Sequence, residues 1–156
     1  MPIDWLPVPA LSQSRPGRCL PACARMILAY LGDDRTEDEL ARLLKSHPAG
    51  TASRNIRRLE SWGYQVEYGQ TSLARLHEYL TADLPPIIFV QTGSLNYWQE
   101  NVNHAIVLVA LTSEHATVID PEFDLPQTVP LSHFLLAWSD FDYSFAVIKK
   151  ILASVP

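Results

Sequence analysis

Residues 19–31 read CLPACARMILAYL and decide the fold, because they predict an apolar helix that begins at a cysteine. Apolar side chains fill most of the segment, so the helix is expected to pack inside a core. Pro21 lies in the first turn, where a missing backbone N–H costs no hydrogen bond. Gly32 follows at the position where helices commonly end. We therefore expect a helix over residues 21–31, with Cys19 at its N-terminal edge.

The rest of the N-terminal half is also predicted to be mainly helical. Residues 1–18 are rich in proline and polar groups and predict an extended segment. Thr36 and Glu39 form a capping box that starts a second helix. Residues 53–62 predict a third helix that ends at Gly63, and Ser72 is expected to cap a fourth. A short strand is expected over residues 64–68.

After residue 86 the pattern changes from helices to strands. Strands are expected over residues 87–90, 104–111, 115–120 and 143–151, with a short helix over residues 132–138. Helices followed by strands are typical of an α+β fold. The length of 156 residues predicts a single domain over residues 1–156. In it, a helical N-terminal lobe would pack against an antiparallel β-sheet C-terminal lobe.

Composition excludes several classes of partner. The net charge is −5, so the chain lacks the basic surface that nucleic acids or anionic membranes require. The N-terminus does not read as a secretory signal, and no apolar run of about 18 residues predicts a membrane span. Two cysteines predict no disulfide framework. We therefore expect a cytoplasmic, thiol-reducing setting without membrane insertion.

Four polar residues, Gln13, Cys19, His104 and Asp120, form a candidate catalytic set. A thiol, an imidazole and a carboxylate are the parts of a nucleophile, its base and the group that orients the base. A side-chain amide is a common oxyanion donor. The N-terminus of a helix favours a thiolate at Cys19, because unpaired backbone N–H groups and the helix dipole point there.

Hairpin arithmetic predicts that His104 and Asp120 are neighbours. If residues 111–113 form a three-residue loop, Ala110 faces Glu114 and His104 faces Asp120 across an antiparallel pair. Directly opposed side chains have Cβ atoms roughly 4.5–5.5 Å apart. A slip of one residue would place the two on opposite faces of the sheet. The register is therefore the assumption on which this contact depends.

Each residue alone also has an ordinary structural interpretation. Cysteines in apolar helices usually serve packing, and we expect this role for Cys23. An isolated histidine at a strand end is more often a satisfied polar residue than a base. The remaining histidines are expected to be solvated: His47, His77, His115 and His133. Order and spacing of the four candidates together favour catalysis.

These motifs resemble the double-glycine (bacteriocin-processing) cysteine peptidase family and its stand-alone relatives, which have a papain-like fold. The stretches that carry the resemblance are Gln13, CLPAC at 19–23, HAIVL at 104–108 and Asp120 with Pro121. Through that resemblance, Cys19 would be the nucleophile, His104 the general base and Asp120 the orienting residue. Gln13 would be the oxyanion donor. The implied reaction is hydrolysis of a peptide bond through a thioester, without metal or cofactor.

The sequence departs from the family at Leu20, where the family usually has glycine. A glycine there lets the substrate backbone approach closely, so a leucine is expected to narrow the cleft or to change its specificity. Residues 93–100, which read GSLNYWQE, are expected to lie at the cleft rim as a substrate-contacting or packed surface loop. The candidate substrate-binding residues are Leu20, Tyr97, Trp98 and Asn103.

Three other functions stay open at this point. The same thioester chemistry serves amidases and transamidases, and a catalytically silent peptide-binding domain would keep the fold. A metal site built on Cys19, Cys23 and His104 is the third alternative, although a structural zinc site needs four ligands. The expected partner is a peptide or protein substrate. The sequence does not define an oligomeric state.

Overall fold

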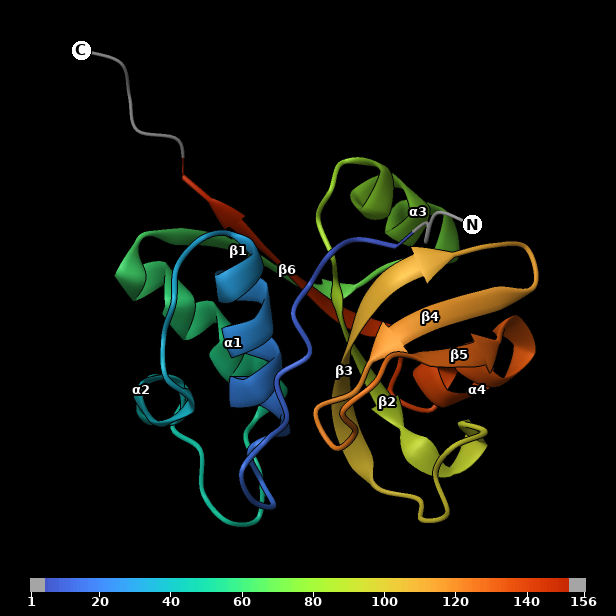
Figure 1. Cartoon of the computed structure of the whole chain (residues 1–156), viewed down its shortest axis with the longest axis horizontal. Helices are drawn as coiled ribbons and strands as arrows, with labels where there is room; N and C mark the ends of the chain where they lie inside the picture. Colours follow the sequence, from blue (N-terminus) through green and yellow to red (C-terminus); the bar gives the residue numbers. More distant parts are fainter. Residues whose placement is uncertain (1–4, 152–156) are drawn as a thin grey trace.

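The computed structural model describes residues 5–151, which fold into an antiparallel sheet with helices on both of its faces (Figure 1). The helices are α1 (Cys19–Tyr30), α2 (Glu37–Leu43), η1 (Ser53–Trp62), α3 (Leu73–Thr81), η2 (Thr92–Ser94) and α4 (Leu131–Ser139). The strands are β1 (Tyr64–Gln70), β2 (Ile87–Gln91), β3 (Asn103–Leu111), β4 (His115–Ile119), β5 (Gln127–Pro130) and β6 (Ser144–Lys150). This is the expected α+β class.

The strands follow the order β1-β6-β2-β3-β4-β5, and the paired strands are antiparallel. Successive side chains of a strand point to opposite faces. On β3, Ala105 and Val107 pack in the core with α1, whereas Ile106 and Leu108 pack in the core with α3 and α4. Both faces are buried, which explains why the strand is a continuous apolar run rather than an alternating one.

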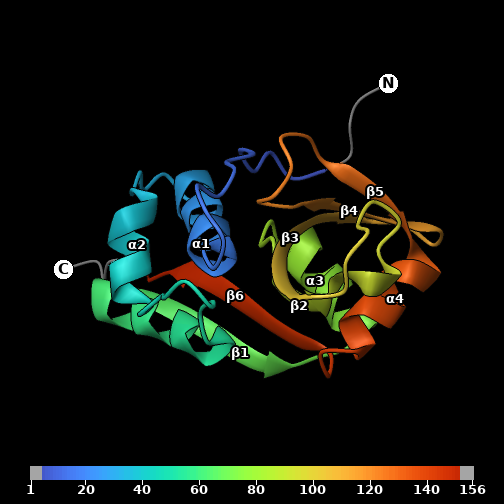
Figure 2. The ribbon, with the colours of Figure 1, turned by 90° about the horizontal axis from the view of Figure 1, so that it is seen from below.

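Helix α1 lies against the sheet, close to β3 (Figures 1 and 2). It starts at Cys19 and ends before Gly32, whose φ of 89° is readily adopted only by glycine. The buried Cys23 thiol donates a hydrogen bond to the carbonyl oxygen of Ala105 at 3.3 Å. One turn of helix separates Cys23 from Cys19, so this contact brings the start of α1 near the start of β3.

Local capping signals in the sequence are confirmed. Thr36 accepts a hydrogen bond from the backbone of Glu39, whose side chain accepts one from Thr36 N in return. Ser72 accepts a bond from Arg75 N at the start of α3. Residues 53–62 form a 3₁₀-helix, which ends at a left-handed Gly63.

Two predictions are wrong in detail. Strand β5 was not expected, because its four residues lie between Pro126 and the helix and carry no alternating pattern. The register of β3 and β4 also differs, since Ala110 pairs with Thr117 instead of facing Glu114. The turn uses residues 112–114, and the register shifts between Leu108 and Ala110.

His104 and Asp120 are nevertheless on the same face of the sheet. Val107 pairs with Ile119, so continuing this register by one residue places Asp120 opposite Ile106. His104 is two residues from Ile106 and therefore points the same way. The two side chains are diagonal neighbours instead of directly opposed ones, a separation that a long side chain spans.

The predictions for the chain ends lie partly outside the described residues. Residues 5–18 contain no helix or strand, whereas the expectations for residues 1–4, including the lack of a secretory signal, concern residues that are not described. The single domain over residues 1–156 likewise stays a prediction. Within residues 5–151, none of the helices has both the length and the apolar character needed to cross a membrane.

Substitutions at Gly17, which packs against the turn at His47, and at Gly63, which has open space, give a matched test of this packing. Both have positive φ, but a Cβ at position 17 would lie 2.6 Å from the carbonyl oxygen of His47, whereas position 63 has open space. We expect Gly63→Ala to lower the free energy of unfolding by about 1–2 kcal/mol. Gly17→Ala should cost about 1–3 kcal/mol more, because backbone must move. Urea denaturation of both variants measures the difference, and equal losses would contradict the close approach.

Candidate active site

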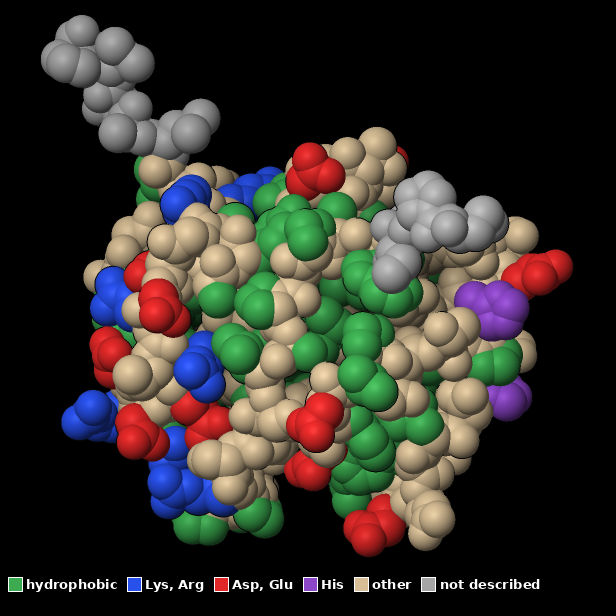
Figure 3. All heavy atoms as spheres, viewed as in Figure 1, with side chains coloured by type: hydrophobic (Ala, Val, Ile, Leu, Met, Phe, Trp, Pro, Cys, Tyr) green, Lys and Arg blue, Asp and Glu red, His purple; other side chains and the backbone are tan. Residues whose placement is uncertain are grey.

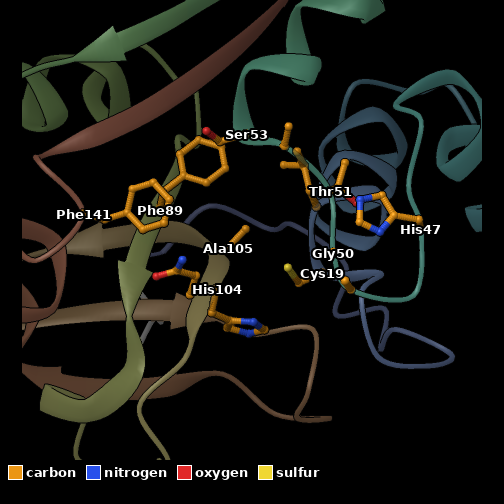
Figure 4. A pocket seen from close by; sticks show the side chains of 13 residues that line it. Cys19, His47, Gly50, Thr51, Ser53, Phe89, His104, Ala105 and Phe141 are labelled. Carbon is orange, nitrogen blue, oxygen red and sulfur yellow. The ribbon is translucent and has the colours of Figure 1, made fainter.

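Cys19 and His104 line one cavity of about 400 Å³. Figure 4 shows Cys19 entering the cavity from α1 and His104 entering it from the sheet. Phe89 and Phe141 line another part of the same cavity. The other lining residues are Leu20, His47, Ala49, Gly50, Thr51, Ala52, Ser53, Asn103 and Ala105. The cavity therefore has one wall from the helical half and one from the sheet.

His104 and Asp120 form a buried pair. The Nε2 atom of His104 lies 2.7 Å from Oδ1 of Asp120, and 4% and 0% of the two side chains are exposed. With Nε2 engaged by the carboxylate, Nδ1 is the ring nitrogen that is available to Cys19. This arrangement matches a base whose orientation and tautomer are fixed by a carboxylate.

The surroundings of His104 raise its pKa to about 9. Burial alone lowers the pKa, because it disfavours the charged ring, but the hydrogen bond with Asp120 and the interaction with the nearby Cys19 outweigh burial. Burial likewise acts to raise the pKa of Asp120, and its bond with His104 brings it below the usual value. Near neutral pH the pair is therefore an imidazolium beside a carboxylate.

Asp120 accepts three further hydrogen bonds. The Tyr97 hydroxyl and the Trp98 indole N–H both donate to Oδ2, at 2.8 and 2.9 Å, and the backbone N–H of Glu122 donates to Oδ1 at 2.9 Å. The Trp98 ring also meets the His104 ring edge-on, with centroids 4.9 Å apart. A buried carboxylate needs such donors, because no water reaches it to replace them.

Two of the four candidate substrate-binding residues, Tyr97 and Trp98, bond Asp120, and their substrate-binding role stays a prediction. Tyr97 and Trp98 are directed at Asp120 and are absent from the lining of the cavity. The exposed Asn103 does line it. Leu20 also contributes to the lining, yet it is only 1% exposed and belongs to the core. Leu20 is therefore held by packing in the core while it forms part of the cavity wall.

Gln13 lies beside the pair but not in the cavity lining. Its backbone N–H donates to the carbonyl of Pro121 at 2.7 Å, which ties it to the residue after Asp120. Its side-chain Nε2 donates to the carbonyl of Arg15 at 3.0 Å, and its buried Oε1 has no partner among the described residues. The Nε2 group carries a second N–H besides the one bonded to Arg15, and the oxyanion-donor role of Gln13 stays a prediction.

Sequence reasoning missed the wall formed by residues 47–53. His47 was expected to be merely solvated; it is exposed, but it also lines the cavity with Thr51. Backbone hydrogen bonds between His47 and Gly50 close this turn. No local sequence pattern predicts this wall, because residues 47–53 reach the cavity only through the packing of the turn against Gly17.

The second cysteine and the metal alternative can also be placed. Cys23 is fully buried in the core, as expected for packing, and burial raises the pKa of its thiol well above the ordinary value. Among residues 5–151, no three His, Cys, Asp or Glu side chains are grouped as ligands of one metal ion. The arrangement of Cys19, Cys23 and His104 is thus not a metal-binding cluster.

Comparison with known proteins agrees with this geometry. The model of the Peptidase_C39 like family matches residues 5–145, so the chain belongs to that family. No curated protein matches the sequence. Family and fold together indicate a cysteine peptidase, which is a hydrolase.

Solved structures give the fold. A double-glycine-motif protease from an AMS/PCAT transporter, crystallised with its leader peptide, is 18% identical with a TM-score of 0.73, covering 94% of each chain. A putative C39-like peptidase from Bacillus anthracis is 16% identical with a TM-score of 0.78, covering 94% of this chain and 96% of the other. The peptidase domain of Streptococcus ComA is 15% identical with a TM-score of 0.74, covering 90% and 97%. The chain has the papain-like fold of these domains.

The bond from Trp98 to Asp120 predicts a stability effect. Trp98→Phe keeps a ring beside His104 but removes the indole N–H. We expect the free energy of unfolding to fall by about 1.5–3 kcal/mol, the range for a hydrogen bond to a charged group. Trp5→Phe, at a 37% exposed position, is the control. Equal stabilities of the two variants in urea denaturation would contradict the role assigned to Trp98.

Proposed function

We propose that the chain hydrolyses peptide bonds with Cys19 as nucleophile, His104 as general base and acid, and Asp120 as the orienting carboxylate. The observation that carries this proposal is the buried His104–Asp120 pair, which faces Cys19 across one cavity. The raised pKa of His104 supports an imidazolium that stabilises the thiolate form of Cys19. Backbone N–H groups at the start of α1 add to this stabilisation.

The reaction proceeds in two steps that balance. The Cys19 thiolate attacks the carbonyl carbon, the C–N bond breaks, and the His104 imidazolium gives its proton to the leaving amine. This step leaves a thioester and a neutral imidazole. Water then attacks the thioester while His104 takes its proton. The carboxylic acid leaves, and the thiolate and imidazolium are restored.

The negative oxygen of each tetrahedral intermediate needs donors. The first N–H groups of α1 lack acceptors within the helix, and the Arg18 side chain makes no capping bond there. These groups are available to an oxyanion near Cys19. The second N–H of the Gln13 amide would add a side-chain donor from the preceding segment. The expected substrate is a peptide or protein segment that enters the cavity; one structural neighbour was crystallised with a leader peptide.

A catalytically silent peptide-binding domain is the second candidate. The observation that favours it is the Gln13 amide, which bonds the carbonyl of Arg15 and is absent from the cavity lining. Amide transfer on the same thioester scaffold would use the same residues with an amine in place of water. Cleavage assays separate the three possibilities.

A peptide-library cleavage assay with thiol variants tests the nucleophile. Cys19→Ala should lower the rate of cleavage by about a thousandfold or more, as expected when a nucleophile is removed. Cys23→Ser is the matched control, since it removes the other thiol from the same helix, keeps a donor for the carbonyl of Ala105 and should retain cleavage. Cleavage by Cys19→Ala at the wild-type rate would contradict the proposal.

The pH dependence of kcat/KM tests the base. His104 must hold a proton to pair with the thiolate, so activity should fall as the pH rises through about 9. Asp120→Asn removes the charge that keeps this pKa high, and the descending limb should move to lower pH. Glu122→Gln keeps the backbone donor to Asp120 and should leave the limb in place. A limb that is unchanged in Asp120→Asn would overturn the assignment.

A further inference from the structure

Glu37 is a buried carboxylate outside the residues discussed so far. It is 8% exposed, and the other buried polar side chains among the described residues are Thr92, His104 and Asp120. Thr92 bonds the backbone of residues 100 and 102 and so shapes the loop before β3. A buried carboxylate is costly unless its oxygens accept hydrogen bonds. The hydrogen-bond donors to the Glu37 carboxylate therefore indicate which segment of the chain it positions.

All of the side-chain partners of Glu37 come from the segment that joins Gln13 to Cys19. The backbone N–H of Ser14 donates to Oε2 at 2.9 Å, and the Ser14 hydroxyl donates to Oε1. The Arg18 guanidinium reaches Oε1 at 3.2 Å and Asp38 at 2.8 Å. One carboxylate thus binds the residue after Gln13 and the residue before Cys19.

This segment has no backbone ladder to hold it, because residues 5–18 form no helix or strand. Its other fixed points are the bond from Gln13 N to Pro121 and the bond from the Thr51 hydroxyl to the carbonyl of Gly17 at 3.1 Å. Without Glu37, Ser14 and Arg18 would lose their common acceptor, and fewer bonds would fix the position of Gln13 relative to Cys19.

We propose that Glu37 is a positioning residue that keeps the Gln13 amide in place for the oxyanion formed at Cys19. This inference rests on the proposed peptidase function. Glu37 lies outside the cavity lining, so it acts through Ser14 and Gln13. Its place in the first turn of α2 also suits a carboxylate, because the helix dipole favours negative charge there.

The variant that tests this is Glu37→Gln. An amide of the same shape presents an NH₂ group to donors that need an acceptor, so the contacts to Ser14 and Arg18 cannot all persist. Peptide kcat/KM should fall at least about tenfold, mainly through kcat, since loss of one oxyanion donor costs about a hundredfold or more. Alkylation of Cys19 by iodoacetamide should change less than about twofold, because alkylation forms no oxyanion.

Two comparisons separate positioning from general destabilisation. Asp38→Asn weakens the exposed ion pairs with Arg15 and Arg18 without touching Ser14 and should keep the wild-type kcat/KM. The double variant Gln13→Ala with Glu37→Gln should be no slower than Gln13→Ala alone, because residues that act as a unit are not additive. Independent, multiplying effects would overturn the proposal, as would an unchanged kcat/KM in Glu37→Gln.

Hydrogen exchange provides a readout that needs no substrate. The backbone amides of residues 13–18 should exchange faster in Glu37→Gln than in wild type or Asp38→Asn, with α1 beyond its first turn unchanged. If the wild-type protein cleaves no peptide, the proposed function fails, and exchange still decides whether Glu37 holds the segment. Wild-type exchange rates in Glu37→Gln would refute the positioning role.

Discussion

A carboxylate that no water reaches must find every hydrogen bond within the protein, and Asp120 meets this constraint with four donors. His104, Tyr97, Trp98 and the backbone of Glu122 converge on its two oxygens. These donors come from β3, from the loop before it and from the turn after β4. Satisfying one buried charge therefore fixes how three separate segments lie around the candidate base.

The opposite wall depends on packing. Helix α1 is buried along most of its length, and its Cys23 thiol is bonded to the carbonyl of the residue after His104. Because the helix is anchored at this turn, Cys19 is presented to the cavity from a rigid element. The candidate base and the candidate nucleophile are thus held in different ways. A network of hydrogen bonds positions His104, and the apolar packing of α1 positions Cys19.

The parts of the fold that sequence predicts are those with local causes. Gly32, the capping box at Thr36 and the cap at Ser72 set helix ends within one turn of themselves. The strand register was wrong because neither the turn, after which Ala116 pairs with Leu111, nor the shift between Leu108 and Ala110 has a signature in residue type. Beyond this shift the register differs from the expected one by two residues, an even number, so His104 and Asp120 remain on the same face.

Contacts between segments that are far apart in the chain could not be predicted from the sequence. The loop at residues 93–100 was recognisable as aromatic, but its binding of Asp120 depends on a fold that Thr92 organises. Glu37 was predictable as a first-turn residue, whereas its hold on Ser14 depends on how α2 packs. The distribution of charge on the surface is simpler. On the α2 side of the face in Figure 3, Lys and Arg side chains lie among Asp and Glu side chains, so this face shows no extended basic surface.

In the proposed site, His104 is an imidazolium that lies between Asp120 and Cys19. Nitrogen NMR of the His104 ring across a pH titration tests it most directly, because it reports protonation of each ring nitrogen without a substrate. The structure predicts that both nitrogens carry protons at pH 7 and that the ring titrates near pH 9. A ring that is neutral at pH 7 and titrates at or below about 6.5, the ordinary value, would contradict the account.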